Sequence, residues 1–354
     1  MAKRVTLQTL AEHLGVSRTT VSNAYNRPEQ LSPQLRQRIF DAAEELGYQG
    51  PDAAARTLRT GRHDTIGVLF TEDLRFVFSD PDTTTFLEGV AEASTGAGTG
   101  VLLLPSPAGM PVHTTPLARA AVDGFIVFSA PDDHPAVHEV RRRDVPVVFV
   151  DEPDLPDAAF LGIDDRGGAS LLGRHLHDLG HRDIGIVSLP MAADRAAGPG
   201  PRTLDDAHNA AVRVVRARTE GIRDAGLDPV VYEAAANDPD AGRAAALELL
   251  RANPTITAIV ALSDQLAIGA TQAAFRLGLD VPADISVVGF DDIPRASTWD
   301  VPLTTIRQPL VDKGRRAAVL LQEMIESDDA WPRRETLPIE LVVRTSSGPA
   351  RRRD

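Results

Sequence analysis

The feature that most constrains the fold is a regular alternation of short apolar runs with helical stretches, which begins at Thr65. Near-continuous apolar runs of this length are typical of parallel strands that are covered on both faces. Helical patterns lie between them at 166–179, 211–225, 240–251 and 264–277. The strand-like runs are 65-TIGVLF, 100-GVLLLP, 124-GFIVFS, 146-PVVFVD, 183-DIGIVSL, 229-PVVYE, 257-TAIVAL and 285-ISVVGF.

These runs predict an α/β body made of two doubly wound, parallel-sheet lobes. A closed eightfold barrel is the competing architecture, but the Pro-rich connectors and the irregular spacing disfavour it. The segment 191–209 contains 198-GPGP-201, which fits neither a helix nor a central strand, so we expect a long loop there. The tail 344–354 is expected to be a frayed end.

The segment before Thr65 has a different pattern, which predicts a small all-α head. Thr6 is placed to cap a first helix that ends at Gly15, and Ser17 is placed to cap a second. Ser32–Pro33 is a typical start for a third helix, which ends at Gly47. Two helices joined by a few residues around a glycine form a helix-turn-helix pattern.

Charge is divided unevenly between these two parts. The chain has 37 Lys+Arg and 50 Asp+Glu, a net charge of −13, which taken whole argues against a nucleic-acid partner. Residues 1–62, however, hold nine basic and six acidic side chains, so they carry +3 and the rest carries −16. A basic segment on an acidic chain indicates a nucleic-acid or membrane contact at the basic end.

Composition excludes several other kinds of site. The chain has no cysteine, which rules out disulfides, thiolate zinc sites and cysteine nucleophiles. It also lacks an apolar run of about 18 residues and a secretory pattern at its start, so we expect a cytoplasmic protein without membrane contact. No phosphate loop, metal spacing or nucleophile elbow occurs, and we therefore expect no cofactor, no metal and no catalytic residue.

The head resembles the DNA-binding domain of the LacI-type repressor family through 5-VTLQTLAEHLGVSRTTVSNAYN-26 and 31-LSPQLRQRIFDAAEELGY-48. The segment 54-AARTL-58 is similar to the hinge helix of that family, although 47-GYQGP-51 has one residue more than the usual Gly-Tyr-x-Pro. The resemblance continues through the body and is weakest over 189–217. Further similar stretches are 163-IDDRGGASLLGRHLHDLGHRDIGIVS-188, 262-LSDQLAIGA-270 and 286-SVVGFDDIPRASTWDVPLTTIRQP-309.

The resemblance implies three parts, namely a head at 1–50, a hinge at 51–62 and a body at 63–354 that is similar to periplasmic sugar-binding proteins. We expect a first lobe at 63–161 and 292–322 and a second at 162–291 and 323–345. It further implies a homodimer that binds a pseudo-palindromic double-stranded DNA operator. The tail lacks the leucine heptads that would hold a tetramer together.

DNA recognition is expected from the second helix and the hinge. Arg18, Thr19 and Asn23 are spaced to share one side of that helix, and Arg and Asn suit guanine and adenine edges. The resemblance implies that Arg18 and Thr19 read bases, and that Leu58 inserts into the minor groove with Arg56 beside it. For Ser17 and Thr20, caps and turn bonds are the alternative to phosphate contacts. The other predicted DNA-contacting residues are Thr6, Ser17, Thr20 and Ser22.

Effector binding is expected in the cleft between the lobes, where the carboxyl ends of the strands meet. Asp291 follows the run 285–290, and Ser263 with Asp264 follows 257–262, although Asp264 can equally cap a helix. Phe76 can stack on a sugar or a base, or it can cover the edge of the first lobe. The resemblance implies further contacts from Asp151 and Arg218, with Asn237 at another strand end.

These features together predict a ligand-responsive repressor whose effector is a small sugar or nucleoside. An extracytoplasmic sugar-binding component of a transporter is one alternative, which the basic head and the missing signal pattern oppose. An α/β enzyme that uses Asp264, Asp291 and Asp292 as acid–base groups is another. The missing catalytic motifs oppose that reading.

Overall fold

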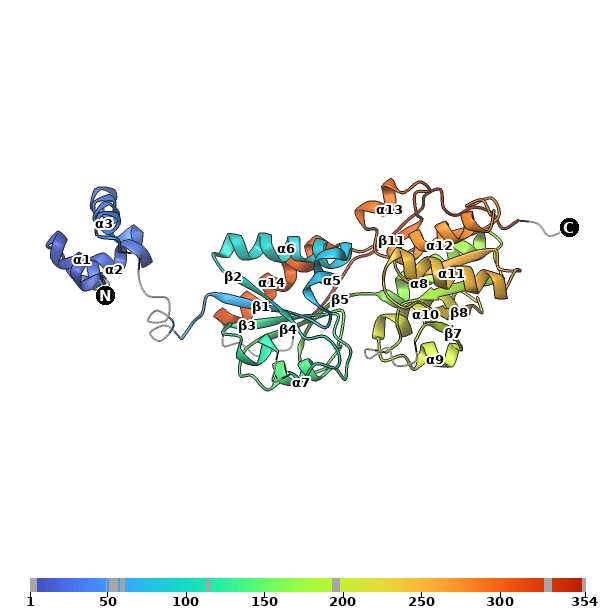
Figure 1. Cartoon of the computed structure of the whole chain (residues 1–354), viewed down its shortest axis with the longest axis horizontal. Coiled ribbons are helices and arrows are strands. Elements are labelled where there is room, and N and C mark those ends of the chain that lie inside the picture. The colour runs from blue at the N-terminus through green and yellow to red at the C-terminus, as the bar shows by residue number, and fades with distance from the viewer. Residues whose placement is uncertain are drawn as a thin grey trace. The chain divides into compact units, whose positions relative to one another are not determined.

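The computed structural model describes residues 5–48, 50, 57, 61–112, 115–192, 198–327 and 333–351. The chain forms two compact units, Met1–His63 and Asp64–Asp354 (Figure 1). The expected hinge residues Arg56 and Leu58 lie outside the described residues. None of the described helices is long and apolar enough to cross a membrane.

The head is a three-helix unit whose ends are set by the expected capping residues. Thr6 Oγ1 accepts a hydrogen bond from the Thr9 N–H, Ser17 Oγ accepts from Thr20 N–H, and Gly15 is left-handed with φ 66°. The helices are α1 (Leu7–Leu14), α2 (Arg18–Asn26), the 3-10 turn η1 (Pro28–Gln30) and α3 (Pro33–Leu46). Their shared core consists of Leu10, Ala11, Val21, Ala24, Ile39, Ala42 and Ala43.

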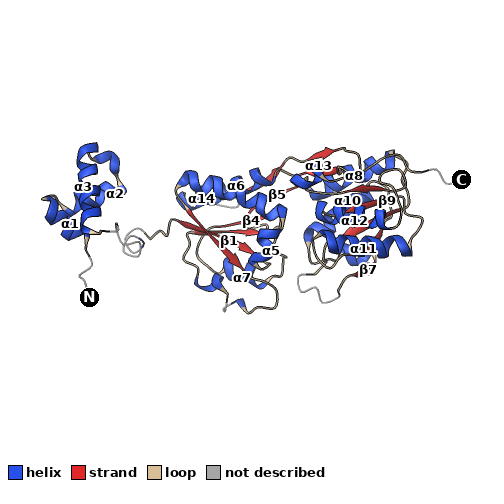
Figure 2. Ribbon diagram, turned by 45° about the horizontal axis from the view of Figure 1, so that its top comes forward, coloured by secondary structure: helices blue, strands red, loops and turns tan. Residues whose placement is uncertain are grey.

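The first lobe is built on a parallel sheet that, in the described part of the chain, has six strands in the order β12-β5-β4-β3-β1-β2. One face packs on α5, α6 and α14, and the other on η3 and α7 (Figure 2). The strands are β1 (Thr65–Phe70), β2 (Gly100–Pro105), β3 (Gly124–Phe128), β4 (Val147–Val150), β5 (Ala159–Ile163) and β12 (Arg334–Leu337). The helices are α5 (Leu74–Ser79), α6 (Pro81–Ala97), η3 (Pro116–Arg119), α7 (Pro135–Arg141) and α14 (Leu310–Glu326).

The second lobe repeats this design with the order β10-β9-β6-β8-β7 among the described strands, of which only β7 runs antiparallel to its neighbour. Helices cover both faces, and a small antiparallel pair, β11–β13, lies beside β10. The strands are β6 (Ile184–Ser188), β7 (Gly200–Arg202), β8 (Val230–Glu233), β9 (Ala258–Ala261), β10 (Ser286–Val288), β11 (Thr305–Arg307) and β13 (Glu340–Val342). The helices are α8 (Asp165–Asp178), α9 (Leu204–His208), α10 (Arg213–Asp224), α11 (Pro239–Ala252), α12 (Asp264–Arg276) and α13 (Pro294–Thr298).

The chain is divided between the lobes differently from the sequence-based expectation. Residues 292–307, expected in the first lobe, belong to the second, because α13 packs in its core and β11 pairs with β13. Residues 323–337, expected in the second lobe, belong to the first, because α14 covers its sheet and β12 pairs with β5. Within the described residues, the chain therefore crosses between the lobes after β5, after β11 and after β12.

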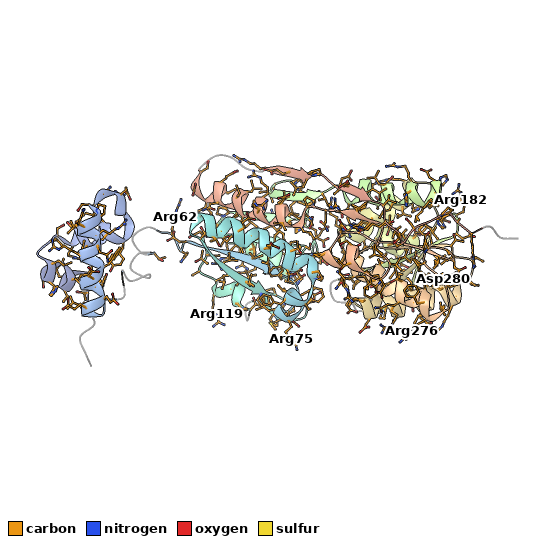
Figure 3. All side chains as sticks on the ribbon, turned by 90° about the horizontal axis from the view of Figure 1, so that it is seen from above. Arg62, Arg75, Arg119, Arg182, Arg276 and Asp280 are labelled. Carbon is orange, nitrogen blue, oxygen red and sulfur yellow. The ribbon has the colours of Figure 1, made fainter. Side chains whose placement is uncertain are left out.

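Two segments are more ordered than the sequence pattern suggested. The expected long loop contains β7, which pairs with the edge of β8, and α9, which starts with a capping box at Thr203 and Asp206. The expected frayed tail is held along the second lobe, where the Val287 N–H donates to the Ser346 carbonyl at 2.8 Å. Buried His181 also bonds this tail, through its Nε2 to the Gly348 carbonyl at 3.0 Å. Exposed side chains such as Arg119 and Arg276 mark the surface of the body (Figure 3).

Candidate DNA-binding helix and effector site

The exposed side of α2 presents the residues expected to read bases. Arg18 and Thr19 are exposed at its start, and their side chains form no hydrogen bond with other described residues. Asn23 lies one turn further along, and its Nδ2 donates to Gln30 Oε1 at 3.0 Å. Because the N-terminal residues of such a helix face base edges in the major groove, Arg18 and Thr19 are available for that contact.

The small hydroxyl residues of the head have local partners. Ser17 Oγ lies 2.8 Å from Thr20 Oγ1 in addition to its cap bond, and Thr6 Oγ1 lies 3.0 Å from Thr9 Oγ1. Capping is therefore the observed role of Thr6 and Ser17, whereas Ser22 is half-buried within α2. An oxygen that caps a helix retains a second lone pair, so these bonds are compatible with a nearby phosphate contact.

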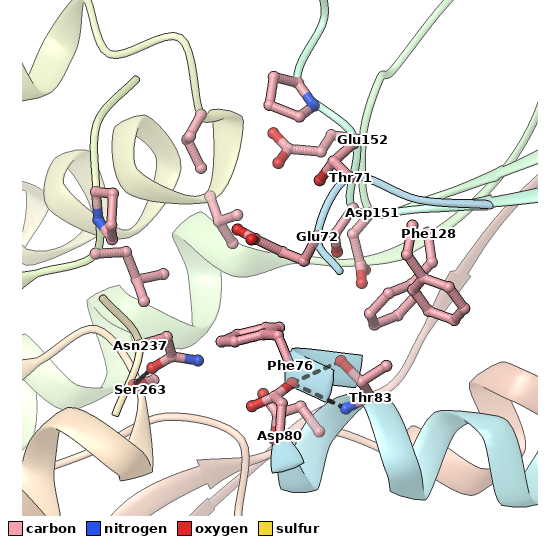
Figure 4. Close-up of a pocket in the computed structure, with 18 of the residues that line it drawn as sticks. Thr71, Glu72, Phe76, Asp80, Thr83, Phe128, Asp151, Glu152, Asn237 and Ser263 are labelled. Carbon is pink, nitrogen blue, oxygen red and sulfur yellow. Dashed lines mark hydrogen bonds between the residues drawn. The ribbon is translucent and has the colours of Figure 1, made fainter. Parts of the chain in front are cut away.

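A cavity of about 220 Å³ lies between the two lobes of the body. Its wall includes most of the residues that the sequence placed in the cleft: Phe76, Asp151, Arg218, Asn237, Ser263 and Asp291. In Figure 4, Phe76 and Glu72 lie between the Asn237–Ser263 pair of the second lobe and Asp151 with Phe128 of the first. The strand-end residues of both lobes therefore meet at one site, as expected for an open α/β sheet.

Asp264 is the expected cleft residue that does not line the cavity. Ser263, not Asp264, caps α12, by accepting from the Leu266 N–H. Asp264 is fully buried and accepts hydrogen bonds from the Ile293 N–H (3.0 Å) and the Thr305 hydroxyl (2.7 Å). Its carboxyl group therefore connects α12 by hydrogen bonds to the residue before α13 and to the first residue of β11, which is a structural role.

The electrostatic centre of the cavity is Arg218 on α10. Its guanidinium Nε donates to Asp165 Oδ1 at 3.0 Å, an Nη atom lies 3.5 Å from Asp291 Oδ1, and the group stacks on Phe290 at 3.6 Å. Burial raises the pKa of both carboxyl groups, while the guanidinium opposes this rise. Gln308 Nε2 also donates to Asp291 Oδ1 at 2.7 Å, so the aspartate has one partner on α10 and one in the segment between β11 and α14.

A second charged pair, Lys313 and Asp151, lies on the first-lobe side of the cavity. Fully buried Lys313 on α14 donates from Nζ to Asp151 Oδ1 and Oδ2 at 2.8 and 3.0 Å, and to Gln308 Oε1 at 2.5 Å. Gln308 therefore joins the Lys313–Asp151 pair of the first lobe to the Asp291–Arg218 pair of the second. This network links both lobes through the segment where the chain crosses after β11.

Backbone conformation at the strand ends is unusual. Ser129 after β3, Asp151 after β4 and Asp291 near the end of β10 have φ of 47°, 64° and 113°, and all three line the cavity. A left-handed conformation costs a residue other than glycine of order 1–3 kcal/mol and is common at ligand sites. These residues hold their side chains toward the cavity at a conformational cost that the surrounding fold must offset.

Sequence reasoning missed several residues of this site. Asp165 follows β5, a strand that was not expected, and Lys313 and Gln308 follow β11, which was also not expected. Asp80 and Asp82 come from the start of α6, where Asp80–Pro81 is a typical cap and first-turn pair that signals a helix but not a cavity. No group of three metal-ligating side chains occurs among the described residues.

Comparisons with known proteins agree with both units. Residues 6–50 match the family described as "Bacterial regulatory proteins, lacI family", and residues 174–347 match "Periplasmic binding protein-like domain". An HTH-type transcriptional regulator of Mycolicibacterium smegmatis is 42% identical over 360 residues, which cover 98% of this chain and 97% of that protein. The HTH-type transcriptional regulator IpsA of Corynebacterium glutamicum is 40% identical over 339 residues, 92% of this chain and 93% of that protein.

Two solved structures are informative. The Lac repressor dimer bound to operator and the anti-inducer ONPF has a TM-score of 0.79 at 27% identity, and the match covers 98% of this chain and all of that one. The complex of the transcriptional regulator CelR with cellobiose has a TM-score of 0.69 at 28% identity, over 97% of this chain and all of that one. The chain belongs to the LacI family of bacterial transcriptional regulators. The predicted helix-turn-helix head and two-lobed periplasmic-binding-like body are confirmed.

Proposed function

We propose that the protein is a repressor that binds a pseudo-palindromic operator as a homodimer and responds to a small sugar or nucleoside in the interlobe cavity. The observation that carries this proposal is the cavity itself, because its polar network joins both lobes through Gln308. A ligand that bonds to this network changes the free energy of one lobe arrangement relative to another. In a dimer, such a change alters the spacing of the two heads.

The cavity lining suits a polyhydroxylated ligand. Carboxylates and the Arg218 guanidinium offer acceptors and donors for hydroxyl groups, while Phe76 and Phe128 supply apolar faces. The solved relatives bind cellobiose or operator DNA, which supports the same classes of ligand here. On this proposal the protein binds an effector and operator DNA and catalyses no reaction. Its location is the cytoplasm, where the DNA lies.

The enzyme alternative is not favoured by the contacts of the carboxylates it requires. Asp264 is occupied by Ile293 and Thr305, and Asp292 Oδ2 lies 2.7 Å from the Arg307 Nε atom. Only Asp291 of the three faces the cavity. A single such carboxylate, already bonded to Gln308 and close to Arg218, is poorly suited to acid–base work.

Recognition of operator bases by α2 is tested with a substitution of Arg18. We expect Arg18→Ala to lose preference for an operator selected from random DNA while it keeps non-specific binding, measured by fluorescence anisotropy. The control is Arg36→Ala, which removes the same charge from the exposed side of α3. An unchanged operator preference in Arg18→Ala contradicts the base-reading role.

The hinge and the effector site are tested separately. Leu58→Ala should weaken operator binding more than non-specific binding, because a leucine inserted into the minor groove contributes only to the specific complex.

Asp291→Asn should keep operator affinity and lose the response to a ligand found by thermal-shift screening of sugars and nucleosides, since a bound ligand raises Tm. A retained response in Asp291→Asn places the effector elsewhere.

A further inference from the structure

The cavity between the lobes holds more carboxyl groups than cations. Within the described residues, Arg218 is the arginine on its wall, and it is shared between Asp165 and Asp291. Lys313, which lies behind the wall, is bonded to Asp151. Both cations are therefore already engaged by carboxylates. The acidic residues of the wall are Glu72, Asp80, Asp82, Asp151, Glu152 and Asp291.

Several of these carboxyl groups have unused hydrogen-bonding capacity. Asp80 is only 6% exposed, and its Oδ2 accepts from the Thr83 N–H and hydroxyl at 3.1 and 2.6 Å, while Oδ1 has no partner among the described residues. Oδ1 of neighbouring Asp82 is also buried without a described partner, while the Asp82 carboxyl group lies within side-chain hydrogen-bonding reach of Asp291. Glu152 is 2% exposed and accepts from the Arg213 N–H at 2.7 Å, with no described ion pair. Such groups favour a ligand that brings donors or positive charge.

His134 supplies the opposite kind of unused group. The side chain is 4% exposed, and its Nδ1 accepts the Ala136 N–H at 3.2 Å as the cap of α7. Burial lowers the pKa of this histidine, so the ring is neutral near pH 7. A neutral ring that accepts at Nδ1 carries its hydrogen on Nε2, and Nε2 has no described acceptor. His134, which lines the cavity, therefore has an N–H group that can donate to a ligand oxygen.

We propose that the effector is a polyhydroxylated molecule with a basic amine, and that phosphorylated and carboxylated analogues are rejected. This inference rests on the proposed function of the cavity. The ammonium group takes the free oxygens of Asp80 and Asp82, and a hydroxyl or ether oxygen accepts from His134 Nε2. An anionic group meets only cations that are already paired and a majority of carboxyl groups, so it is repelled.

A panel of matched ligands tests whether amino compounds bind more tightly than neutral compounds, and neutral compounds more tightly than anionic ones. Glucose, glucosamine, glucose 6-phosphate and glucuronate, with the same four forms of mannose, galactose and ribose where they exist, are compared by thermal shift and by their effect on operator binding. We expect the best amino compound to bind about tenfold tighter than its neutral parent, because a charge-assisted bond is stronger than a neutral one. Tighter binding of a phosphate or uronate overturns the inference.

Two variants test whether the Asp80 and Asp82 carboxyl groups cause the preference for an amine. Burial raises the pKa of both carboxyl groups, that of Asp82 well above its ordinary value, and a bound ammonium group favours their ionised form. Asp82→Asn and Asp80→Asn remove the ionisable group while an amide oxygen can still accept hydrogen bonds, so the amino and neutral ligands should approach equal affinity. Asp300→Asn is the control, because Asp300 is exposed and lies outside the cavity wall. An undiminished amine preference in both cavity variants overturns the assignment.

The charge of the cavity is also measurable without a known ligand. Phe76→Trp, in a chain whose Trp299 and Trp331 are replaced by Phe, places a fluorescent reporter on the wall. We expect caesium to quench it more than iodide, with acrylamide as the neutral reference and Asp82→Asn reducing the difference. Equal quenching by the two ions overturns the inference. A failure of the proposed function is distinguishable, since no panel compound of any charge would then alter operator binding.

Discussion

At the scale of single residues, Arg218 is the centre of a buried ion network in the body. Its buried guanidinium is the shared partner of Asp165 and Asp291, two carboxylates that are themselves 2% exposed. The net stability of a buried ion network relative to an apolar core is small, because desolvation opposes the Coulomb attraction. Removal of one partner is different, because it leaves the remaining charges buried and uncompensated.

We therefore predict that Arg218→Met lowers the free energy of unfolding by about 3–5 kcal/mol. Urea denaturation followed by circular dichroism measures this change. Arg166→Met is the matched control, because Arg166 pairs with Glu220 and Asp224 at the surface and its side chain is 55% exposed. An exposed pair contributes less than about 1 kcal/mol. Equal losses in the two variants would show that burial does not set the strength of the Arg218 network.

Glu152 provides a pH-dependent residue. Burial raises its pKa from 4.5 to about 7, with Asp132 and Asp151 adding to the effect and the Arg213 N–H opposing it. Because the folded-state pKa lies above the unfolded one, the folded protein holds the proton more tightly between these two values. This contribution to stability is complete below about pH 4.5 and is lost as pH rises toward and beyond 7.

We predict that Glu152→Gln, which is neutral at every pH, unfolds at higher urea than the parent at pH 8 and at a similar concentration at pH 5. The gain at pH 8 is at most about 3 kcal/mol, from the size of the pKa shift. Glu248→Gln, at an exposed position on α11, should leave the pH profile unchanged. Parallel profiles for the parent and Glu152→Gln would disprove the role of Glu152.

The residues of the candidate site were predictable only in part. Asp151 and Asp291 follow apolar strands, so the strand-end rule finds them directly. The same rule also selects Asp264, because it identifies a position and not the direction in which a carboxyl group turns. Lys313 and Asp82 are on helices whose sequence patterns carry no sign of a cavity, and only the tertiary packing brings them to it.

At the scale of elements, the first lobe depends on close packing between α6 and α14. Gly89 of α6 and Gly314 of α14 face the backbone of the opposite helix. A Cβ added at Gly89 would lie 1.9 Å from the Val311 carbonyl oxygen, and one at Gly314 would lie 1.9 Å from the Phe86 carbonyl oxygen. Glycine at these two positions allows the helices to approach each other closely.

We predict that Gly89→Ala destabilises the body by about 2 kcal/mol or more, because the two helices must move apart. Gly96→Ala on the same helix is the control, since a Cβ there meets no atom within 4 Å. It should stabilise the helix by about 0.5–1 kcal/mol through the reduced freedom of the unfolded chain. Thermal unfolding of both variants measures these changes, and a stable Gly89→Ala would contradict the close approach.

Most elements were predictable because their residues carry a strong local pattern. All eight apolar runs form strands, and in most of them the β-branched and aliphatic residues are buried on both faces of a sheet; the exceptions are β2, which is largely exposed, and the first residue of β8. β5, β7, β11, β12 and β13 were not predicted. β7, β11 and β13 have three residues each, and all of these strands except β5 contain charged residues. Their identity depends on pairing with distant strands, which no local pattern records. The lobe boundaries were placed incorrectly around β11 and β12, whose pairing assigns them to the other lobe.

At the scale of the whole molecule, the head and the body are separate compact units. We predict that a fragment of residues 62–354 keeps the thermal transition of the body and the binding of any effector found for the intact protein. It should lose operator binding, because Arg18 and the rest of α2 are absent. Calorimetry and anisotropy measure these properties. A fragment that fails to fold would show that the body requires the head.

The three crossings between the lobes also determine the order in which the chain can be completed during synthesis. The first lobe begins at β1, but its covering helix α14 and its edge strand β12 lie more than 200 residues later, up to Leu337. The head can fold as soon as it leaves the ribosome, whereas the first lobe lacks its last strand until β12 has been made, and the second lobe until β13 has been made. A ribosome stalled before Leu310 therefore carries a finished DNA-binding head on a body that has no closed cavity and cannot respond to an effector.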